Sequence, residues 1–333
     1  MRGVRAIART APASLSSSPP LLGLGIIVFA ATLFGMLGPL SRAAYDLGIE
    51  PLSFVAWRAT IGALALGAVV ALAIARGRSL VGLRTLDTRG RLAYLTAIGT
   101  GIALNFAIFA AFQRIEVGLA LLCFYFYPAL TAAVEIVRGR ERLDASRAVA
   151  LLLASGGMVA VLAGAFGRGI VLDPLGVGLA LLAAVSQTIF IAVSRDAYRA
   201  MPTDQAMAGI LVGGAIAALP IAFLVDGPAA FGSPLADPAL LGVVLVAGTF
   251  GAALPSLLFL TGIRLVGGTV AGILMLFEPV VGVALAALLL DERLQPIQFV
   301  GGLSILVAAV IIQRAVSRER GADPDASLCR EPV

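Results

Sequence analysis

The sequence contains ten apolar segments, each close to the length at which a helix crosses a lipid bilayer. Such a helix needs about 20 mostly apolar residues, and the segments are 21–43, 51–75, 92–112, 117–137, 147–167, 175–194, 205–225, 239–262, 268–289 and 297–314. Only 13% of the 333 residues are charged, whereas soluble proteins average about 25%. We therefore predict an all-α integral membrane protein with ten transmembrane helices.

The arginines are distributed unequally between the two sides of the predicted membrane. All 24 basic residues are Arg; with the N-terminus inside, nineteen lie on the inner side, four on the outer side, and Arg58 within the second segment. Because positive residues accumulate on the cytoplasmic side, we expect both termini in the cytoplasm, with residues 1–20 and 315–333 as disordered tails. The apolar run from Leu21 is too long for a cleaved signal peptide and is expected to remain as the first helix.

The two halves of the sequence resemble each other at three places in the same order. The motif "SRAAY" returns as "SRDAY", "LNFAIFAAFQRI" aligns with "LPSLLFLTGIRL", and "FYPALTAAVEIVRGRERL" aligns with "FEPVVGVALAALLLDERL", at offsets of 150 to 153 residues. Each half holds five segments, an odd number, so the second half enters the membrane from the opposite face. We predict two inverted five-helix repeats, 21–167 and 175–314. Such repeats favour alternating access around a central site, although a duplication could also serve only to build a stable bundle.

One acidic residue, Glu278, lies inside the ninth segment and directly precedes Pro279. At about 1.5 Å per residue, Glu278 is about 15 Å deep, near the bilayer midplane, and its repeat partner Tyr127 reaches the same depth beside Pro128. Proline removes a backbone hydrogen bond, and a broken helix is tolerated at this depth mainly where it faces protein or a wet cavity. We expect helix breaks at both prolines and a substrate or proton site at Glu278; a neutral Glu278 that only holds helices together is the alternative.

The second segment carries another buried charge, Arg58. It could bind a substrate carboxylate, pair with Glu278, or extend its long side chain toward the membrane surface. Three further polar residues at mid-depth could bond a substrate or join helices: Asn105, Gln187 and Ser256.

Neighbouring residues of the fourth segment are assigned other roles. Tyr125 is two residues from Tyr127, so on a regular helix the two side chains point in different directions, and we expect Tyr125 to pack rather than to face a cavity. Glu135 lies near Arg138 and Arg140, which favours a local ion pair. Structural roles at helix ends are expected for the acids of the two "ERL" motifs, Glu141 and Glu292.

The composition argues against several classes of function. The chain has no His and two isolated cysteines, Cys123 and Cys329, so neither a metal site nor a disulfide framework is indicated, and no cofactor is expected. There is no nucleotide-binding P-loop and no basic patch interleaved with aromatics, which argues against nucleic acid. An intramembrane enzyme would need a nucleophile with a base or clustered acids, and a scaffold or receptor would need a further domain; neither feature is present.

The prolines of the fourth and ninth segments, the following "RERL" and "DERL", and "AWRATIGAL" in the second segment resemble the EamA branch of the drug/metabolite transporter superfamily. The resemblance covers residues 21–314. It implies a ten-helix fold, export through a central cavity walled by both halves, and a place in the bacterial plasma (inner) membrane. The family moves amino acids, other metabolites and drugs, so the resemblance selects no substrate.

These observations predict a secondary-active exporter of small metabolites such as amino acids or related compounds. Its expected partners are a small-molecule substrate, protons as a candidate coupling ion, and the lipid bilayer, while monomer and homodimer both remain open. A proton-coupled exporter of lipophilic cations is the second reading, with Glu278 as counter-ion. An aromatic content of only 7% disfavours an aromatic cage for such cations.

Overall fold

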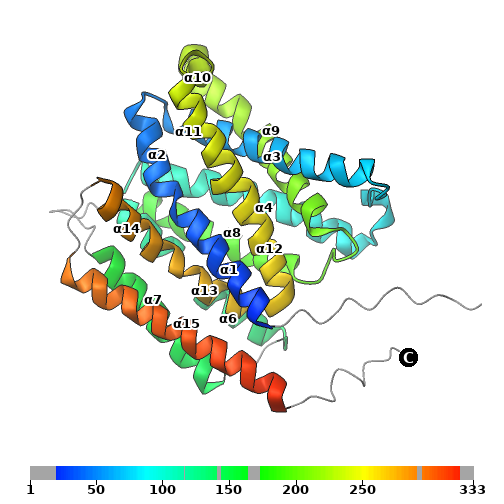
Figure 1. The fold of residues 1–333 in the computed structure, drawn as a ribbon, viewed down its shortest axis with the longest axis vertical. Helices are drawn as coiled ribbons and strands as arrows, with labels where there is room; N and C mark the ends of the chain where they lie inside the picture. The colour runs from blue at the N-terminus through cyan, green and yellow to red at the C-terminus, as the bar shows by residue number, and fades with distance from the viewer. Residues whose placement is uncertain (1–19, 116, 141–143, 164–172, 291–294, 323–333) are drawn as a thin grey trace, which may run out of the picture.

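The structure, a computed structural model, describes residues 20–115, 117–140, 144–163, 173–290 and 295–322 (Figure 1). The predicted N-terminal tail lies outside the described residues except for Pro20, which begins the first helix. The last helix runs to Ala322, so the first part of the predicted C-terminal tail is helical, and residues 323–333 lie outside the described residues. Glu141 and Glu292 also lie outside them.

The described residues are helical nearly throughout. The membrane-spanning elements are α1 (Pro20–Gly35), α2 (Leu37–Asp46), α3 (Pro51–Ala75), α4 (Thr88–Phe112), α5 (Val117–Phe124), α6 (Tyr127–Val137), α7 (Ala145–Ala163), α8 (Pro174–Ser194), α9 (Thr203–Val225), α11 (Pro238–Gly248), the π-helix η2 (Thr249–Ala253), α12 (Leu254–Val266), α13 (Gly268–Met275), α14 (Phe277–Leu290) and α15 (Pro296–Ala322). A short 3₁₀ helix, η1 (Leu83–Thr85), and helix α10 (Gly227–Ala236) lie between spans. Joined across their breaks, these elements form ten candidate membrane spans within the described residues, which confirms the predicted all-α, ten-helix fold.

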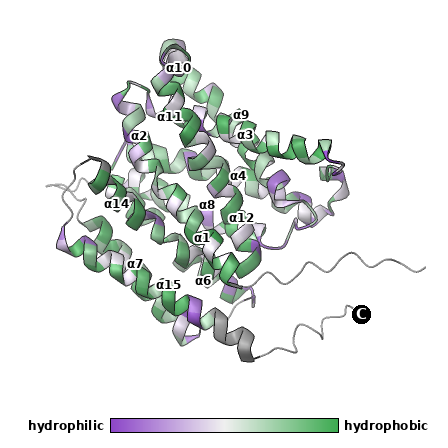
Figure 2. Ribbon diagram, viewed as in Figure 1, coloured by the Kyte–Doolittle hydropathy of each residue, from purple (hydrophilic) through white to green (hydrophobic). Residues whose placement is uncertain are grey.

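Proline and aspartate begin several of these helices. Pro51, Pro174 and Pro238 each occupy the first helical position, where the missing N–H is not needed. The Asp173 and Asp237 side chains accept hydrogen bonds from the first turns of α8 and α11. The apolar surface follows the helices, and hydrophilic residues gather at the loops (Figure 2).

Four of the ten spans are not continuous α-helices. The fourth and ninth spans divide next to Pro128 and Pro279, into α5 and α6 and into α13 and α14. The first span also divides at Met36, and the eighth contains the π-helix η2 just before Pro255. The sequence pattern predicts the first two of these four features and not the others.

Nearly every large helix interface joins one half of the chain to the other. Helix α3 packs on α9, α7 on α15, and α6 on α13, while α1 packs on α12 and, in the equivalent arrangement, α8 packs on α4. This exchange of partners is the pattern of two inverted repeats. Helices α7 and α15 lie side by side at the edge of the molecule (Figure 1), where a Cβ on Gly157 would lie 2.6 Å from the carbonyl oxygen of Gly301.

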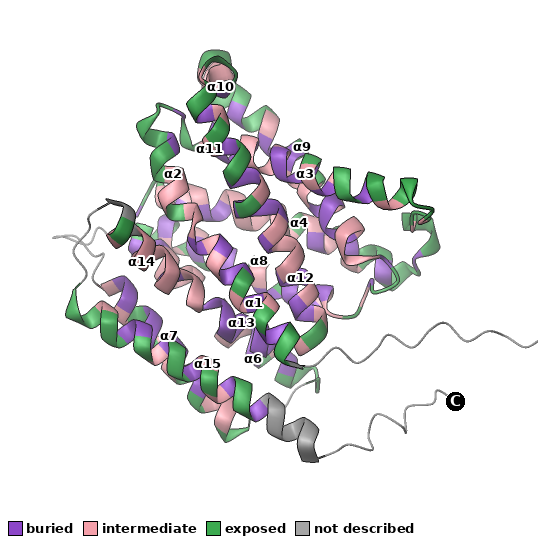
Figure 3. Cartoon of the chain, viewed as in Figure 1, coloured by how far each residue is buried: buried purple, intermediate pink, exposed green. Residues whose placement is uncertain are grey.

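The start of α1 and the end of α12 mark one side of the membrane. Gly23 of α1 lies against the Val266 side chain, so α13 begins on the side at which α1 begins. The end of α15 is on that side too, whereas α2 and α10 lie at the opposite side (Figure 1). We call the first of these the α1 side. Figure 3 shows the buried residues facing inward and the exposed ones facing outward along most helices, as expected of a bundle in lipid.

Candidate functional site

A cavity of about 300 Å³ lies between the two halves of the chain. It is lined by helices of both repeats, and all six predicted polar or aromatic site residues contribute to it: Arg58 (α3), Asn105 (α4), Tyr127 (α6), Gln187 (α8), Ser256 (α12) and Glu278 (α14). Residues spread over 220 positions of sequence, from 58 to 278, thus meet in one place.

On α3 and α4 the cavity lining lies in the half of the membrane remote from the α1 side. Helix α3, which begins on the remote side, lines it only with residues from Leu52 to Ala59. Helix α4, which ends on the remote side, lines it from Gly101 to Phe112. On α8 and α9 the lining continues further toward the α1 side, to Phe190 and Met207, which lie near the α1-side ends of their helices.

Glu278 lies in the first turn of α14. Because the ninth span breaks next to Pro279, a new helix begins at this point within the span. A carboxylate is stabilised at a helix N-terminus, because the backbone N–H groups there point toward it. Gly35 fixes this turn against α1: a Cβ at Gly35 would lie 2.8 Å from the Glu278 carbonyl oxygen and 2.8 Å from the Val281 Cβ. The close approach of α1 and α14 therefore determines where the carboxylate lies.

Arg58 neither extends to the membrane surface nor forms an ion pair with Glu278 among the described residues. Its guanidinium donates to the Asn105 side-chain oxygen at 3.2 Å and to the Gly251 carbonyl at 3.5 Å. The Asn105 amide is oriented in turn by donating to the Gly101 carbonyl at 2.8 Å. The cavity therefore holds a cation and a carboxylate that are separately supported.

Tyr125 lines the cavity together with Tyr127, so the prediction that Tyr125 only packs is wrong. The prediction assumed a continuous helix, but residues 125 and 126 form the turn between α5 and α6, which releases them from helical spacing. The Tyr125 ring lies 6.4 Å from that of Tyr127, and Tyr125 and Glu278 both line the cavity. The Tyr127 backbone carbonyl accepts a hydrogen bond from Thr188 at 3.3 Å.

Aromatic side chains are concentrated in the cavity although they are few in the chain. Nine of the 22 Phe, Tyr and Trp residues line it: Phe34, Phe106, Phe109, Phe112, Phe124, Tyr125, Tyr127, Phe190 and Phe259. The low overall content therefore does not argue against an aromatic environment for a ligand, because composition says nothing of where the rings gather.

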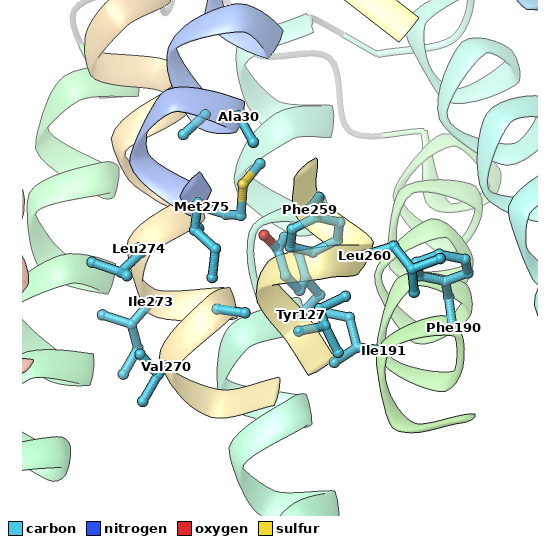
Figure 4. Packing of buried hydrophobic residues seen from close by; sticks show 14 of the residues in the cluster. Ala30, Tyr127, Phe190, Ile191, Phe259, Leu260, Val270, Ile273, Leu274 and Met275 are labelled. Atoms are coloured by element: carbon cyan, nitrogen blue, oxygen red, sulfur yellow. The ribbon is translucent and has the colours of Figure 1, made fainter. Parts of the chain in front are cut away.

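The cavity ends on a densely packed floor, toward the α1 side (Figure 4). Tyr127, Phe259 and Met275 line the cavity from below and are all nearly inaccessible to solvent. Ile191 of α8 and Val270 of α13 are also buried. Figure 4 shows Tyr127, Phe259 and Ile191 grouped together in this view, beside Met275 and Val270 of α13. The cavity is thus separated from the α1 side.

Glu135 lies below this floor and outside the cavity lining. It is fully buried and forms ion pairs with Arg195 of α8 at 2.7 Å and with Arg140 at 3.7 Å. The predicted local pairing with Arg140 is present, but the shorter contact is to the other half of the chain. Arg138 donates instead to the Ala192 carbonyl.

Gln187 and Ser256 line the cavity from α8 and α12. Ser256 follows the π-helix η2, whose Ala252 also lines the cavity and whose Gly251 carbonyl accepts from Arg58. π-Helical turns are frequent at functional sites. Pro255 at the start of α12 is the one sequence signal that could have indicated this irregularity.

The cavity contains no arrangement suited to a metal ion. Among the residues that the structure describes, no three of His, Cys, Asp or Glu come together in a potential metal site. The polar groups of the cavity are instead suited to hydrogen-bonding and charge contacts with a small organic molecule.

Comparison with known proteins assigns the chain to a family. The profile of the EamA-like transporter family matches twice, over residues 21–163 and 174–314. A solved crystal structure, described only as that of a protein, is similar with a TM-score of 0.75 over 90% of this chain and 98% of its own, at 19% identity, which shows a shared fold. No curated protein matches the sequence. With both repeats matched, the chain belongs to the EamA-like transporter family.

Proposed function

We propose that the protein is a secondary-active exporter of small metabolites, such as amino acids or related compounds, working by alternating access around the cavity. The observation that carries this proposal is the meeting of six midplane residues from both repeats at one cavity that is closed toward the α1 side. We place it in the bacterial inner membrane with both termini in the cytoplasm, as the nineteen-to-four arginine distribution supports.

The separation of the two charges fits a molecule with two ionic groups. Arg58, held by Asn105, presents guanidinium N–H donors that suit a carboxylate. Glu278 lies at the start of α14 and suits an ammonium group or a proton. The apolar walls between them would cover the remainder of such a molecule, as in most small-molecule sites.

A second candidate is a proton-coupled exporter of lipophilic cations. The nine aromatic side chains around the cavity favour it, because aromatic faces attract cations and Glu278 could serve as the counter-ion. Arg58 argues against this candidate, since a fixed positive charge in the same cavity repels a cation.

A growth-protection screen distinguishes the two candidates. The protein would be expressed in a sensitive bacterial host challenged with toxic amino-acid analogues and, separately, with lipophilic cations. Protection against the analogues alone supports the metabolite exporter, and protection against the cations alone overturns it. Glu278→Gln serves as the matched variant: we expect it to abolish protection at unchanged membrane abundance, and full protection would remove Glu278 from the mechanism.

A further inference from the structure

Helices α6 and α13 meet below the cavity floor in an interface that contains three buried polar side chains. Thr131 and Glu135 are one helical turn apart on α6 and are fully buried, and Thr269 of α13 is 2% exposed. Gly268 allows the contact, because a Cβ there would lie 3.2 Å from the Thr131 methyl and 3.6 Å from the Glu135 Cγ. We call this interface, defined by Thr131, Glu135, Gly268 and Thr269, the seam.

The polar atoms of the seam are not satisfied in the closed arrangement. Among the described residues, the Thr131 and Thr269 hydroxyls have no hydrogen-bond partner, and one Glu135 oxygen has none beyond its 3.7 Å ion pair with Arg140. Burying such groups without partners is costly, and most buried polar atoms in proteins have one. An interface that served only to hold two helices together would be more stable with apolar side chains at these positions.

An ion pair between the two halves of the chain lies at the end of the seam nearer the α1 side. The second Glu135 oxygen accepts from Arg195 at 2.7 Å, and Arg138 and Arg140 donate to the Ala192 carbonyl at 3.3 and 3.1 Å. Helix α6 belongs to the first half and α8 to the second, so these contacts join the halves on the α1 side. They form a polar latch beneath an apolar floor.

The fourth span consists of α5 and α6 and the ninth of α13 and α14, and only one half of each span packs closely on the other span. Helices α6 and α13 pack closely, whereas α5 and α14 form no comparable interface, and the cavity occupies that region. Because the repeats are inverted, the two interfaces can exchange their states. In the alternate state α5 would pack closely on α14, and α6 would separate from α13. The unsatisfied seam oxygens would then be hydrated.

We propose that the seam is the passage that connects the cavity to the α1 side in the alternate state, with Thr131, Glu135 and Thr269 as its polar lining and the Glu135–Arg195 pair as its latch. This inference rests on the proposed alternating access. In the open passage, the buried seam oxygens contact water and the transported molecule.

Thiol accessibility tests the passage directly. In a chain with Cys123→Ala and Cys329→Ala, Thr131→Cys would be treated with a membrane-impermeant maleimide in vesicles of each orientation. We expect labelling only from the α1 side, faster by roughly tenfold when the latch is removed by Glu135→Gln with Arg195→Gln. The double substitution removes both charges of the buried pair together, which is less destabilising than removing one partner alone. Ala132→Cys, equally buried on the same helix, is the control whose labelling should not respond.

A valine substitution tests whether the orphaned hydroxyls bias the seam toward opening. Thr269→Val removes a hydroxyl at nearly constant shape, so it should raise the Tm and slow labelling of Thr131→Cys, by roughly tenfold if one unsatisfied group is relieved. A lower Tm would show that the hydroxyl has a partner in the closed seam and would overturn the inference. Thr60→Val, which removes a hydroxyl bonded to the Ala56 carbonyl, should lower the Tm.

The outcomes for the seam and for the proposed function are separable. Labelling reports access without requiring any substrate, whereas the growth screen reports transport through Glu278. Absence of Thr131→Cys labelling in both vesicle orientations, with the latch removed, sinks the passage even if transport depends on Glu278. Labelling with no transport of either compound class leaves the passage standing and removes the proposed function.

Discussion

The Arg58 guanidinium donates to the Asn105 side-chain oxygen at 3.2 Å, so the positive charge of the cavity is held by a neutral amide and not neutralised by a carboxylate. A guanidinium held in this way keeps its charge available for a ligand. Asn105→Asp would place an anion beside Arg58 and neutralise it. We expect affinity for a carboxylate-bearing substrate to fall at least tenfold, the scale of a charge-assisted hydrogen bond of about 1.5–3 kcal/mol. Binding measured in detergent by thermal shift would check this, and unchanged affinity would exclude Arg58 as the carboxylate site.

Arg58 and Glu278 should not be interchangeable. Each charge has its own support: Asn105 and the Gly251 carbonyl for Arg58, and the start of α14 for Glu278. We expect Arg58→Glu with Glu278→Arg to remain inactive, because an arginine at a helix N-terminus opposes the dipole. Transport by the double variant, measured beside the two single variants at matched membrane abundance, checks this. Restored transport in the swap would instead reveal an ion pair formed in another state.

Gly35 should be intolerant of a side chain although it lies outside the cavity lining. Its Cβ would overlap the Glu278 carbonyl and the Val281 side chain, each 2.8 Å away. Gly35→Ala therefore displaces α14 and its carboxylate, at a cost of about 1–3 kcal/mol for an overpacked contact, and we expect transport to fall more than membrane abundance. Gly25→Ala on the same helix, where a Cβ meets nothing within 4 Å, is the control; equal effects in both would point to helix α1 in general.

Gly157 should matter for stability and not for the site. A Cβ there would lie 2.6 Å from the Gly301 carbonyl oxygen and 3.0 Å from Ile305, so Gly157→Ala forces α7 and α15 apart. We expect a Tm several degrees lower than that of Gly156→Ala, whose added methyl meets nothing within 4 Å. Scanning calorimetry in detergent measures the difference, and matching Tm values would show that the two helices adjust without cost.

The sequence predicts the spans well, because they follow from one-dimensional rules. Hydrocarbon thickness determines segment length, and counting 1.5 Å per residue places Glu278 and Tyr127 at a common depth. The repeat then pairs them across the centre. The sequence leaves substrate contact and helix packing both open for the other four candidates, Arg58, Asn105, Gln187 and Ser256. The structure places all six at one cavity.

Features that depend on contacts between helices could not be predicted in this way. The partner of Arg58 is determined by the packing of α3 against its neighbours, and the partner of Glu135 by α8 crossing α6. Tyr125 was misassigned because a local turn cancels the helical spacing that the prediction used. The break at Met36 and the π-helix at Thr249–Ala253 have no strong signal in the residues that form them.

The packing of each helix of the first half against helices of the second half has a consequence for biogenesis. Since α1, α3, α4, α6 and α7 find their main partners in residues beyond 173, the first five spans enter the bilayer before any of those partners has been synthesised. During that interval, surfaces such as the one around Gly157 face lipid or an insertion factor. The chain is therefore a single unit of assembly: its N-terminal half made alone should be a substrate for membrane proteases, and joint synthesis of both halves as separate chains should protect it.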